Sequence, residues 1–559
     1  MQDDNNNASD SGASIVDDTG NNLNGTVAVE SSASAPQTSV DKMPTKKPIL
    51  LAVLGVLLLA AIAAAAYFLV MNNSSDDSNA AITKPVESLN VGIVEADITF
   101  YPENAIFSSS NAVNIQMFEG LVTYEDLKNI RPALATSWTN PDSKTWDFEL
   151  KQNVMFHNGE LMTADDVVAS FELAQENQDI ADIFLGTIDS VTKQSDTVVR
   201  IVTTEPDPVL LNKLAFVYIV DPETYSEGVI PAGTGHYLPE SADSYTDQMI
   251  QMKAFESYHE GPVTGVQKLK IAVYPDAEAG YEAYNNDEID VLEQTGEAIT
   301  DGSVSREYET FGYSDLGANY LGINSTKEGP LSNLQVREAI RLAVDPQKLI
   351  EETSSIEGVV ANQLLASDIP GYSPEVVPAV SNAEKSKELL SEAGYPDGIT
   401  VELTYFVSVK DVAQGIQKQL AEAGITATLD EQTDGPSIGA KVFGGANGGA
   451  QLWLAGFTSD INDASDAYAA LFDDSANFSD EQISSQLATA YSTLDGAERL
   501  NTLQQVSKEL IEKVAYVPLY RNTYVLAYDN ENFVFEQSYP GALSGIKYAN
   551  FQVSEETSE

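Results

Sequence analysis

Few residues in this chain have the types and spacing that nucleophilic chemistry needs. The GPSIG run at 435–439 matches the nucleophile elbow of hydrolases, in which a buried strand leads into the serine and a catalytic histidine follows it. Here the acidic, turn-like run DEQTD precedes Ser437, and His157, His236 and His259 all lie upstream of it. We therefore expect this run to be a loop, and we expect the protein not to be an enzyme.

Metal and phosphate sites are not indicated either. Asp460, Asn462 and Asp463 carry oxygen ligands, but the spacing of a calcium loop fails because position 464 is Ala. The run GTGHY at 233–237 lacks the third glycine of a dinucleotide loop, and the chain has no cysteine for thiolate ligation. We expect no metal and no cofactor, with His236 and His259 as ordinary surface or turn residues.

Composition limits the kind of partner. The chain has 559 residues, of which 43% are hydrophobic and 20% charged, as is typical of a large folded protein. Its 85 acidic and 29 basic side chains give a formal net charge of −56 at pH 7. Because so acidic a surface repels phosphate backbones, we expect no nucleic-acid partner.

The helices and strands that must position any site are indicated by two kinds of hydrophobic pattern, one typical of strands and one typical of helices. Runs of β-branched and aromatic residues predict strands at LNVGIV, KTWDFEL, TVVRIVT, KLKIAVY, ITVELTYF and YVLAYD. Apolar stripes of helical period lie between them, and Thr163 and Ser479 each begin a capping-box spacing. Asn158-Gly159 predicts a tight turn. Mixed strands and helices over this length indicate an α/β fold with more than one lobe.

The first part of the sequence predicts a disordered tail followed by a membrane anchor. Residues 1–48 are rich in Asn, Ser and Asp and are expected to form a disordered cytoplasmic tail. The uncharged run 49–70 is about 33 Å long as a helix, enough to cross a bilayer core of about 30 Å. A cleaved signal peptide is the alternative, but its apolar region and its leader should both be shorter. Lysines before the run favour a cytoplasmic N-terminus, so we expect a cell-membrane protein with a 71–85 linker and an extracellular domain at 86–559.

An ordered series of motifs runs through this large domain. It begins with MFEGLVTYED, PALATSW and DSKTWDFELKQNVMFHNGELMTADDVVAS between positions 117 and 170. It continues with GTGHY, NNDEIDVL, NLQVREAIRLAVDPQKLI, AEKSKELLSEAGYPDG, GIQKQLAEAGI and YVPLY. In order and spacing, over roughly residues 88–551, the series resembles the family-5 extracellular solute-binding proteins. These are the dipeptide- and oligopeptide-binding components of ABC importers.

The resemblance implies an α/β, two-lobed Venus-flytrap fold of the large cluster with an extra domain. By analogy, the first lobe would comprise roughly 86–120, 206–310 and 515–559. The extra domain would be about 121–205, and the second lobe about 311–514. Ligand would be enclosed between the lobes by hinge closure, with no chemical step.

The resemblance also implies an anchor for the ligand. The segment QLWLAGFTSDIND at 451–463 matches the stretch in which relatives carry an aspartate that contacts the α-ammonium group of a bound peptide. In this sequence that residue is Asp460, and a ligand ammonium would supply its missing partner. The alternative is that Asp460 caps a turn. Oligopeptide binders have an arginine where this chain has Leu454, so that cationic contact is gone.

Four further residues are expected to line the site. Phe457 stands where relatives often have tryptophan and would offer an apolar wall to the first side chain of the ligand. Looser matching adds Glu119, Tyr320 and Tyr520 on the opposing surfaces.

The leading hypothesis is a membrane-anchored, monomeric substrate-binding protein. It would capture peptides outside the cell and deliver them to the permease and ATPase subunits of an ABC importer. Two alternatives stay open, namely a binder of another small solute such as a nickel chelate, and a surface peptide sensor independent of transport.

Overall fold

The computed structural model describes most of the chain beyond position 85. The described residues are 86–94, 101–102, 108–226, 229–241, 243–246, 248–295, 303–306, 308–353, 356–443, 449–457, 459, 461–473, 477–528, 533–535 and 547–553. All of them belong to the compact unit Ala80–Glu559. No helix in these ranges combines the length and apolar character that crossing a membrane requires. The expected tail, span and linker at 1–48, 49–70 and 71–85 lie outside the described residues.

Helices and strands alternate along this unit. The α-helices are α2 (Ser108–Met117), α3 (Ala164–Glu176), α4 (Gln178–Ile180), α5 (Leu210–Leu214), α6 (Ala277–Asn285), α8 (Leu334–Ala343), α9 (Pro346–Glu352), α10 (Ala383–Glu392), α11 (Lys410–Glu422), α12 (Gly435–Phe443), α13 (Ala464–Tyr468), α14 (Glu481–Ser492) and α15 (Gly496–Glu512). The strands are β1 (Leu89–Val94), β2 (Val122–Tyr124), β3 (Ile130–Pro132), β4 (Ala135–Asp142), β5 (Thr145–Leu150), β6 (Ile188–Ser195), β7 (Val198–Thr203), β8 (Tyr237–Pro239), β9 (Tyr245–Thr246), β10 (Met249–Ala254), β11 (Lys268–Tyr274), β12 (Val291–Thr295), β13 (Glu309–Ser314), β14 (Asn319–Ile323), β15 (Gly358–Val360), β16 (Ile399–Phe406), β17 (Ile425–Gln432), β18 (Leu452–Gly456), β19 (Tyr516–Tyr528), β20 (Phe533–Phe535) and β21 (Phe551–Val553).

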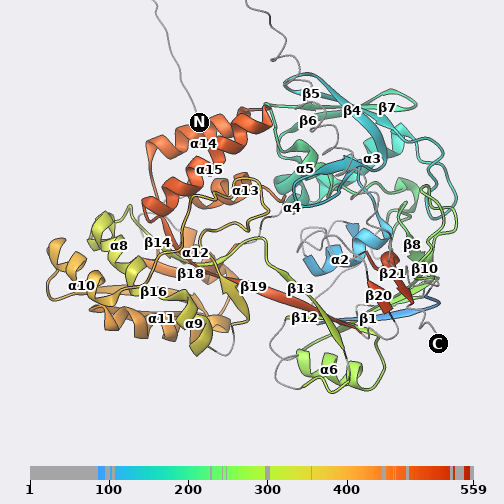
Figure 1. Cartoon of the computed structure of the whole chain (residues 1–559). Helices are drawn as coiled ribbons and strands as arrows, with labels where there is room; N and C mark the ends of the chain where they lie inside the picture. Colours follow the sequence, from blue (N-terminus) through green and yellow to red (C-terminus); the bar gives the residue numbers. More distant parts are fainter. Residues whose placement is uncertain are drawn as a thin grey trace, which may run out of the picture. The chain divides into compact units, whose positions relative to one another are not determined.

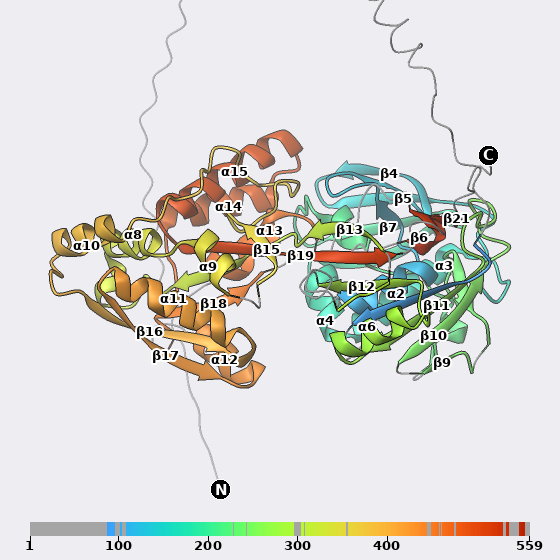
Figure 2. The ribbon, with the colours of Figure 1, turned by 60° about the horizontal axis from the view of Figure 1, so that its bottom comes forward.

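One large mixed sheet organises this part of the chain, in the order β17-β16-β18-β14-β19-β12-β1-β11-β10-β8. Strand β19 lies in the middle of this order and joins the two halves of the sheet, because its first part pairs with β14 and β15 and its second part with β12 and β13. Figures 1 and 2 show β19 as one long red strand running between them. We call strands β1 and β8 to β12 the β1 half, and strands β14 and β16 to β18 the β16 half.

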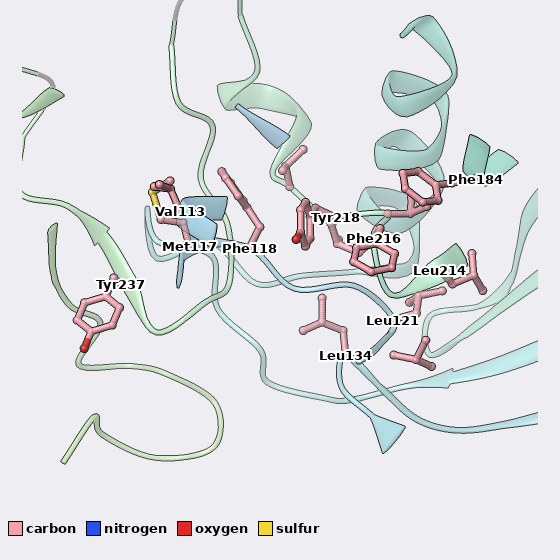
Figure 3. Close-up of a cluster of buried hydrophobic side chains, with 14 of the residues drawn as sticks. Val113, Met117, Phe118, Leu121, Leu134, Phe184, Leu214, Phe216, Tyr218 and Tyr237 are labelled. Atoms are coloured by element: carbon pink, nitrogen blue, oxygen red, sulfur yellow. The ribbon is translucent and has the colours of Figure 1, made fainter. Parts of the chain in front are cut away.

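The β1 half has a parallel centre. Strand β1 lies parallel to both β11 and β12, and its Leu89 and Val91 are fully buried, as expected for a strand covered on both faces. Helix α6 packs against β1 and β12. Figure 3 shows a buried cluster that includes Val113, Met117 and Phe118 from α2 and the segment after it, together with side chains from segments outside this half, such as Leu134 and Phe184.

A separate four-stranded antiparallel sheet has the order β4-β5-β7-β6 and is covered by α3. The predicted strands KTWDFEL and TVVRIVT are confirmed here as β5 and β7. Thr163 begins α3 with the predicted capping box, since its side chain and that of Asp166 satisfy each other's backbone N–H groups. The predicted turn at Asn158-Gly159 is also confirmed, with Gly159 at a φ of 91°.

The β16 half is an α/β unit of parallel strands and covering helices. β16 runs parallel to β17 and β18, and α11 packs against β16 and β17. The predicted apolar stripe of α8, which is Val336, Ile340 and Ala343, is buried. Glycine follows two of these helices where the backbone turns left-handed, with φ of 96° at Gly394 and 81° at Gly424.

Two chain crossings connect the halves side by side. One is the segment 315–318 between β13 and β14, and the other is the middle of β19. The Asp315 backbone N–H donates to the Asn522 carbonyl at 2.9 Å, and the Asn522 amide donates to the Asp315 carboxylate at 3.4 Å. The two crossings therefore lie beside each other, joined by these hydrogen bonds.

Two local predictions are wrong. The GPSIG run is not a loop but the start of α12, because the Asp434 carboxylate accepts hydrogen bonds from the Ser437 N–H and hydroxyl, both at 2.8 Å. The start of α14 is displaced by one residue from the predicted capping box at Ser479. Asp480 caps it instead, accepting from Gln482 N–H and Ile483 N–H.

Candidate functional site

The β16 half contains a pocket of about 500 Å³, which is within the usual range for small-molecule sites. Strands β14, β18 and β19 form its floor, since β14 is hydrogen-bonded to both of the others. One face of α12, the segment after β16 and the first turn of α11 supply the walls. The described lining residues are Asn319, Tyr320, Phe406, Val409, Val412, Gly435, Ile438, Gly439, Val442, Leu454, Ala455, Gly456, Phe457, Leu471, Leu519 and Tyr520.

Two tyrosines reach this pocket from adjacent strands. Tyr320 of β14 and Tyr520 of β19 are brought close by the strand register, in which Asn319 faces Tyr520. Their exposed fractions are 4% and 5%. Burial raises the pKa of each hydroxyl to about 12, so both are neutral and able to donate at physiological pH.

Phe457 and Leu454 line the same pocket from β18 and the residue after it. Phe457 is half-buried, and its backbone N–H donates to the Ala318 carbonyl at 3.2 Å, which ties the end of β18 to the crossing segment. Because Leu454 is an apolar side chain that is only 5% exposed, this wall is apolar. None of the described lining residues is charged.

Asp460 lies outside the described residues, but its neighbours are firmly positioned. The Ser459 hydroxyl donates to the Asp466 carboxylate at 2.9 Å and accepts from the Asp463 N–H at 3.0 Å. The Ile461 carbonyl accepts from the Tyr124 hydroxyl at 2.7 Å and from the Asn212 amide at 3.0 Å. Both donors come from segments earlier in the chain than the β16 half, so they hold this loop from outside it.

Asn462 is a residue that the sequence did not single out as functional. It is fully buried with a φ of 51°, and neither its amide nitrogen nor its carbonyl oxygen has a hydrogen-bond partner among the described residues. Asparagine tolerates this left-handed conformation better than most residues. That preference was the only feature of the sequence that could have indicated the unusual backbone at Asn462. A buried, unpaired amide two positions after Asp460 marks the loop as strained.

The structure places Glu119 elsewhere, in the β1 half. Its carboxylate accepts from the Thr234 hydroxyl at 2.8 Å and the Tyr258 hydroxyl at 3.0 Å, and lies 2.8 Å from His259 Nε2. Burial opposes ionisation of Glu119, but the hydrogen bond from His259, the charge interactions with His259 and His236, and the hydrogen bond from Thr234 together outweigh it and lower its pKa to about 2. Glu119 is therefore a buried charge with its own partners, separate from the lining of the pocket.

His259 lies in a turn, as predicted, but His259 and His236 belong to this Glu119 cluster and are not ordinary surface residues. The His259 side chain is 3% exposed, with its Nδ1 3.1 Å from the ammonium of Lys151 and its Nε2 facing Glu119. The His236 ring lies against Tyr258 with centroids 4.2 Å apart. Sequence spacing carried no signal of this cluster, because its members come from distant segments.

No group of three or more His, Asp or Glu side chains in the described part of the chain is arranged to hold a metal ion. The geometry provides a partly open, largely apolar pocket whose lining includes two tyrosines and an asparagine. A two-part α/β fold with such a pocket has the size and lining suited to a small molecule.

Comparisons with known proteins identify the family. The family model for bacterial extracellular solute-binding proteins, family 5 (middle region), matches residues 129–479. Heme-binding protein A of Haemophilus influenzae is 30% identical over 340 residues, covering 54% of this chain and 61% of that protein. The dipeptide-binding protein of Escherichia coli is 27% identical over 402 residues, covering 65% and 74%. The solved structure of HbpA2 from Haemophilus parasuis has a TM-score of 0.71 at 22% identity, covering 84% of this chain and all (100%) of that one.

This chain belongs to the family-5 bacterial extracellular solute-binding proteins. The predicted family and α/β fold are thereby confirmed. The solved structure shows the fold alone, and the match to heme-binding protein A spans about three fifths of that relative's length.

Proposed function

We propose that this protein captures peptides outside the cell and delivers them to the permease and ATPase subunits of an ABC importer. Membership of the solute-binding family supports capture of a small molecule. Similarity to a protein named for dipeptide binding supports a peptide as that molecule.

One observation carries the proposal. Tyr320, Phe457 and Tyr520, which come from three separate segments of the chain, line a single pocket of about 500 Å³. The neutral hydroxyls are suited to the amide groups of a peptide and the ring of Phe457 to an apolar side chain. Asp460, three positions after Phe457 in the sequence, would hold the α-ammonium group.

Capture is proposed to proceed by hinge closure. In this proposal the β1 half and the β16 half are the cores of the two lobes, with the first lobe at about 86–120, 206–310 and 515–559, the extra domain at about 121–205, and the second lobe at about 311–514. The crossings at Asp315 and Asn522 would form the hinge. Glu119 would act from the first lobe as a supporting residue of its wall.

Titration calorimetry of the full-length protein with a panel of di- and tripeptides tests the proposal. Asp460→Asn should weaken peptide binding by about 2 to 4 kcal/mol, as expected when one partner of a buried charge pair is lost. N-acetylated peptides should bind the unchanged protein poorly for the same reason. Asp368→Asn is a matched control, because that carboxylate forms an exposed ion pair with Lys128. Equal affinity for free and acetylated peptides, together with no effect of Asp460→Asn, would refute the peptide assignment.

A second candidate ligand has its own support. The 30% identity with heme-binding protein A favours a solute with a large apolar ring system. The same titrations with hemin distinguish the two candidates, because a peptide binder should show saturable binding to the peptides and not to hemin. Saturable hemin binding without peptide binding would replace the leading proposal.

Membrane anchoring is proposed from the sequence alone. Residues 49–70 would span the membrane once, with 1–48 in the cytoplasm and the binding domain outside, as a monomer. Protease added to intact cells should digest the binding domain and spare a tag placed at the N-terminus. Recovery of a soluble protein that begins near position 67 would instead indicate a cleaved signal.

A further inference from the structure

The wall of the pocket formed by α12 has an unusual composition. Four of its residues line the pocket, namely Gly435, Ile438, Gly439 and Val442. Their spacing of three, four and seven positions places them on one face of the helix. This face therefore presents two apolar side chains and two glycines to the pocket.

The two glycines keep volume open. A Cβ atom built on Gly435 or on Gly439 would meet no other heavy atom within 4 Å. Neither glycine has a positive φ, so neither is required by the backbone conformation. Glycine makes a helix less stable than alanine does. The two glycines on the pocket-facing side of α12 therefore lower the stability of this helix, and their structural effect is a deeper pocket.

The opposite wall is apolar as well. Phe406, Val409 and Val412 face the pocket from the end of β16 and the start of α11, and Leu519 does so from β19. The lysine of α12, Lys441, is not a lining residue and is occupied by Asp430 at 2.8 Å and Glu402 at 3.7 Å. A charged side chain entering the pocket would thus lose water without gaining a counter-charge from its described lining.

We propose that this pocket selects peptides by one large, neutral apolar side chain, aromatic or branched aliphatic, and that the glycine face of α12 sets its depth. The inference rests on the proposed capture of peptides and adds to it the class of side chain that is recognised. Gly439 is the specificity-determining position, since a side chain there would project into space that the ligand needs.

Tripeptides that are alanine except at one position provide the test. With Phe or Leu at the position that enters the pocket, the full-length protein should bind about 10- to 100-fold more tightly than with Ala, as expected for burying a large apolar side chain. Lys or Asp at the same position should bind no better than Ala. Equal affinity for Phe, Ala and Lys at all three positions would overturn the inference while leaving peptide capture intact.

Gly439→Leu fills the pocket without disturbing the helix, because leucine is a good helix former and its Cβ meets no neighbour. The preference for Phe over Ala should fall below about threefold. Gly496→Leu is the matched control, since Gly496 begins α15, its Cβ is also free of neighbours, and it is not among the lining residues. Should Gly439→Leu lower the thermal midpoint, Gly439→Ala gives a smaller loss of the same preference. A preference that survives Gly439→Leu would overturn the inference.

A probe that is not a peptide separates this inference from the proposed function. The neutral fluorophore N-phenyl-1-naphthylamine should bind the unchanged protein and should bind Gly439→Leu at least about fivefold more weakly. If the probe binds and no peptide does, the proposal of peptide capture is wrong, and so is a peptide side chain as the occupant of the pocket. The pocket would then still be a site for apolar molecules. Failure of the probe to bind, with peptides bound normally and without preference, would overturn the apolar selection alone.

Discussion

Arg499 and Asp463 form a bidentate ion pair in the interior of the protein, with guanidinium-to-carboxylate distances of 2.6 and 2.8 Å. Their side chains are only 9% and 4% exposed. Asp463 also caps α13 by accepting from the Ser465 N–H. The pair therefore connects α15 to the loop that follows β18, three residues from Asp460.

We expect Arg499→Leu to lower the free energy of unfolding by about 3 to 5 kcal/mol, because Asp463 would be left charged and buried without its partner. Urea unfolding followed by fluorescence measures this. Lys128→Leu is the control, since Lys128 and Asp368 pair at 3.0 Å with 52% and 63% exposure and such pairs contribute at most about 1 kcal/mol. A loss below about 1 kcal/mol for Arg499→Leu would contradict the prediction.

The Ile461 carbonyl provides a second test, because it accepts from both Tyr124 and Asn212. Tyr124→Phe and Asn212→Leu should each cost about 1 kcal/mol or less, since the carbonyl keeps one donor. The double variant should lower the free energy of unfolding by about 1 kcal/mol more than the sum of the two single effects, because the buried Ile461 carbonyl then has no hydrogen-bond donor.

Tyr405→Phe provides a control for this double-mutant cycle of Tyr124 and Asn212. Tyr405 donates to Glu431 in the β16 half and shares no partner with Tyr124. Combined with Tyr124→Phe, its effect should be additive within about 0.5 kcal/mol. Additivity in the Tyr124 and Asn212 cycle as well would show that the two donors do not act on a common acceptor.

Stability should fall as the pH is lowered from about 6.5 to about 4. Burial lowers the pKa of His157 and of His236 to about 4, below the ordinary value of 6.5. Between these values the unfolded chain binds protons that the folded chain does not, so folding free energy is lost, by about 3 kcal/mol for each histidine as an upper value. Glu119, with a pKa of about 2 against 4.5, adds a further loss only below about pH 4.5.

Unfolding measured between pH 5 and pH 8 isolates the histidines. His157 accepts from the Gly233 N–H through Nδ1 at 3.3 Å, and its Nε2 donates to the Gly235 carbonyl at 3.1 Å, so protonating Nδ1 would break a contact. His157→Gln should therefore reduce the slope of stability against pH by roughly half. A slope that is unchanged in both His157→Gln and His236→Gln would contradict this origin.

We expect ligand to draw the two halves of the large sheet together as near-rigid bodies, with bending at the paired crossings at Asp315 and Asn522. Small-angle scattering of the full-length protein in detergent, with contrast matching, should give a smaller radius of gyration for the binding domain when peptide is saturating. Tight binding with no change in that radius would argue against hinge closure in this protein.

Local sequence was sufficient for much of the fold. The six predicted strands all occur, because β-branched and aromatic runs of this length are stable only when paired and buried. Thr163 and Asn158-Gly159 were predictable for the same reason, since a cap and a tight turn depend on neighbours within a few positions. The order of motifs along the chain was sufficient for the family.

The tertiary structure alone decided what those elements bring together. Tyr320, Phe457 and Tyr520 meet because β14 pairs with β18 on one side and β19 on the other, a register that no local pattern encodes. The GPSIG run became a helix because Asp434 caps it, and its glycines then faced the pocket. Glu119 found Thr234, Tyr258 and His259 more than a hundred residues away. A buried charge is stable only when it has hydrogen-bonding or charged partners. Contacts between residues so far apart in the sequence depend on how the elements pack, and sequence periodicity does not predict them.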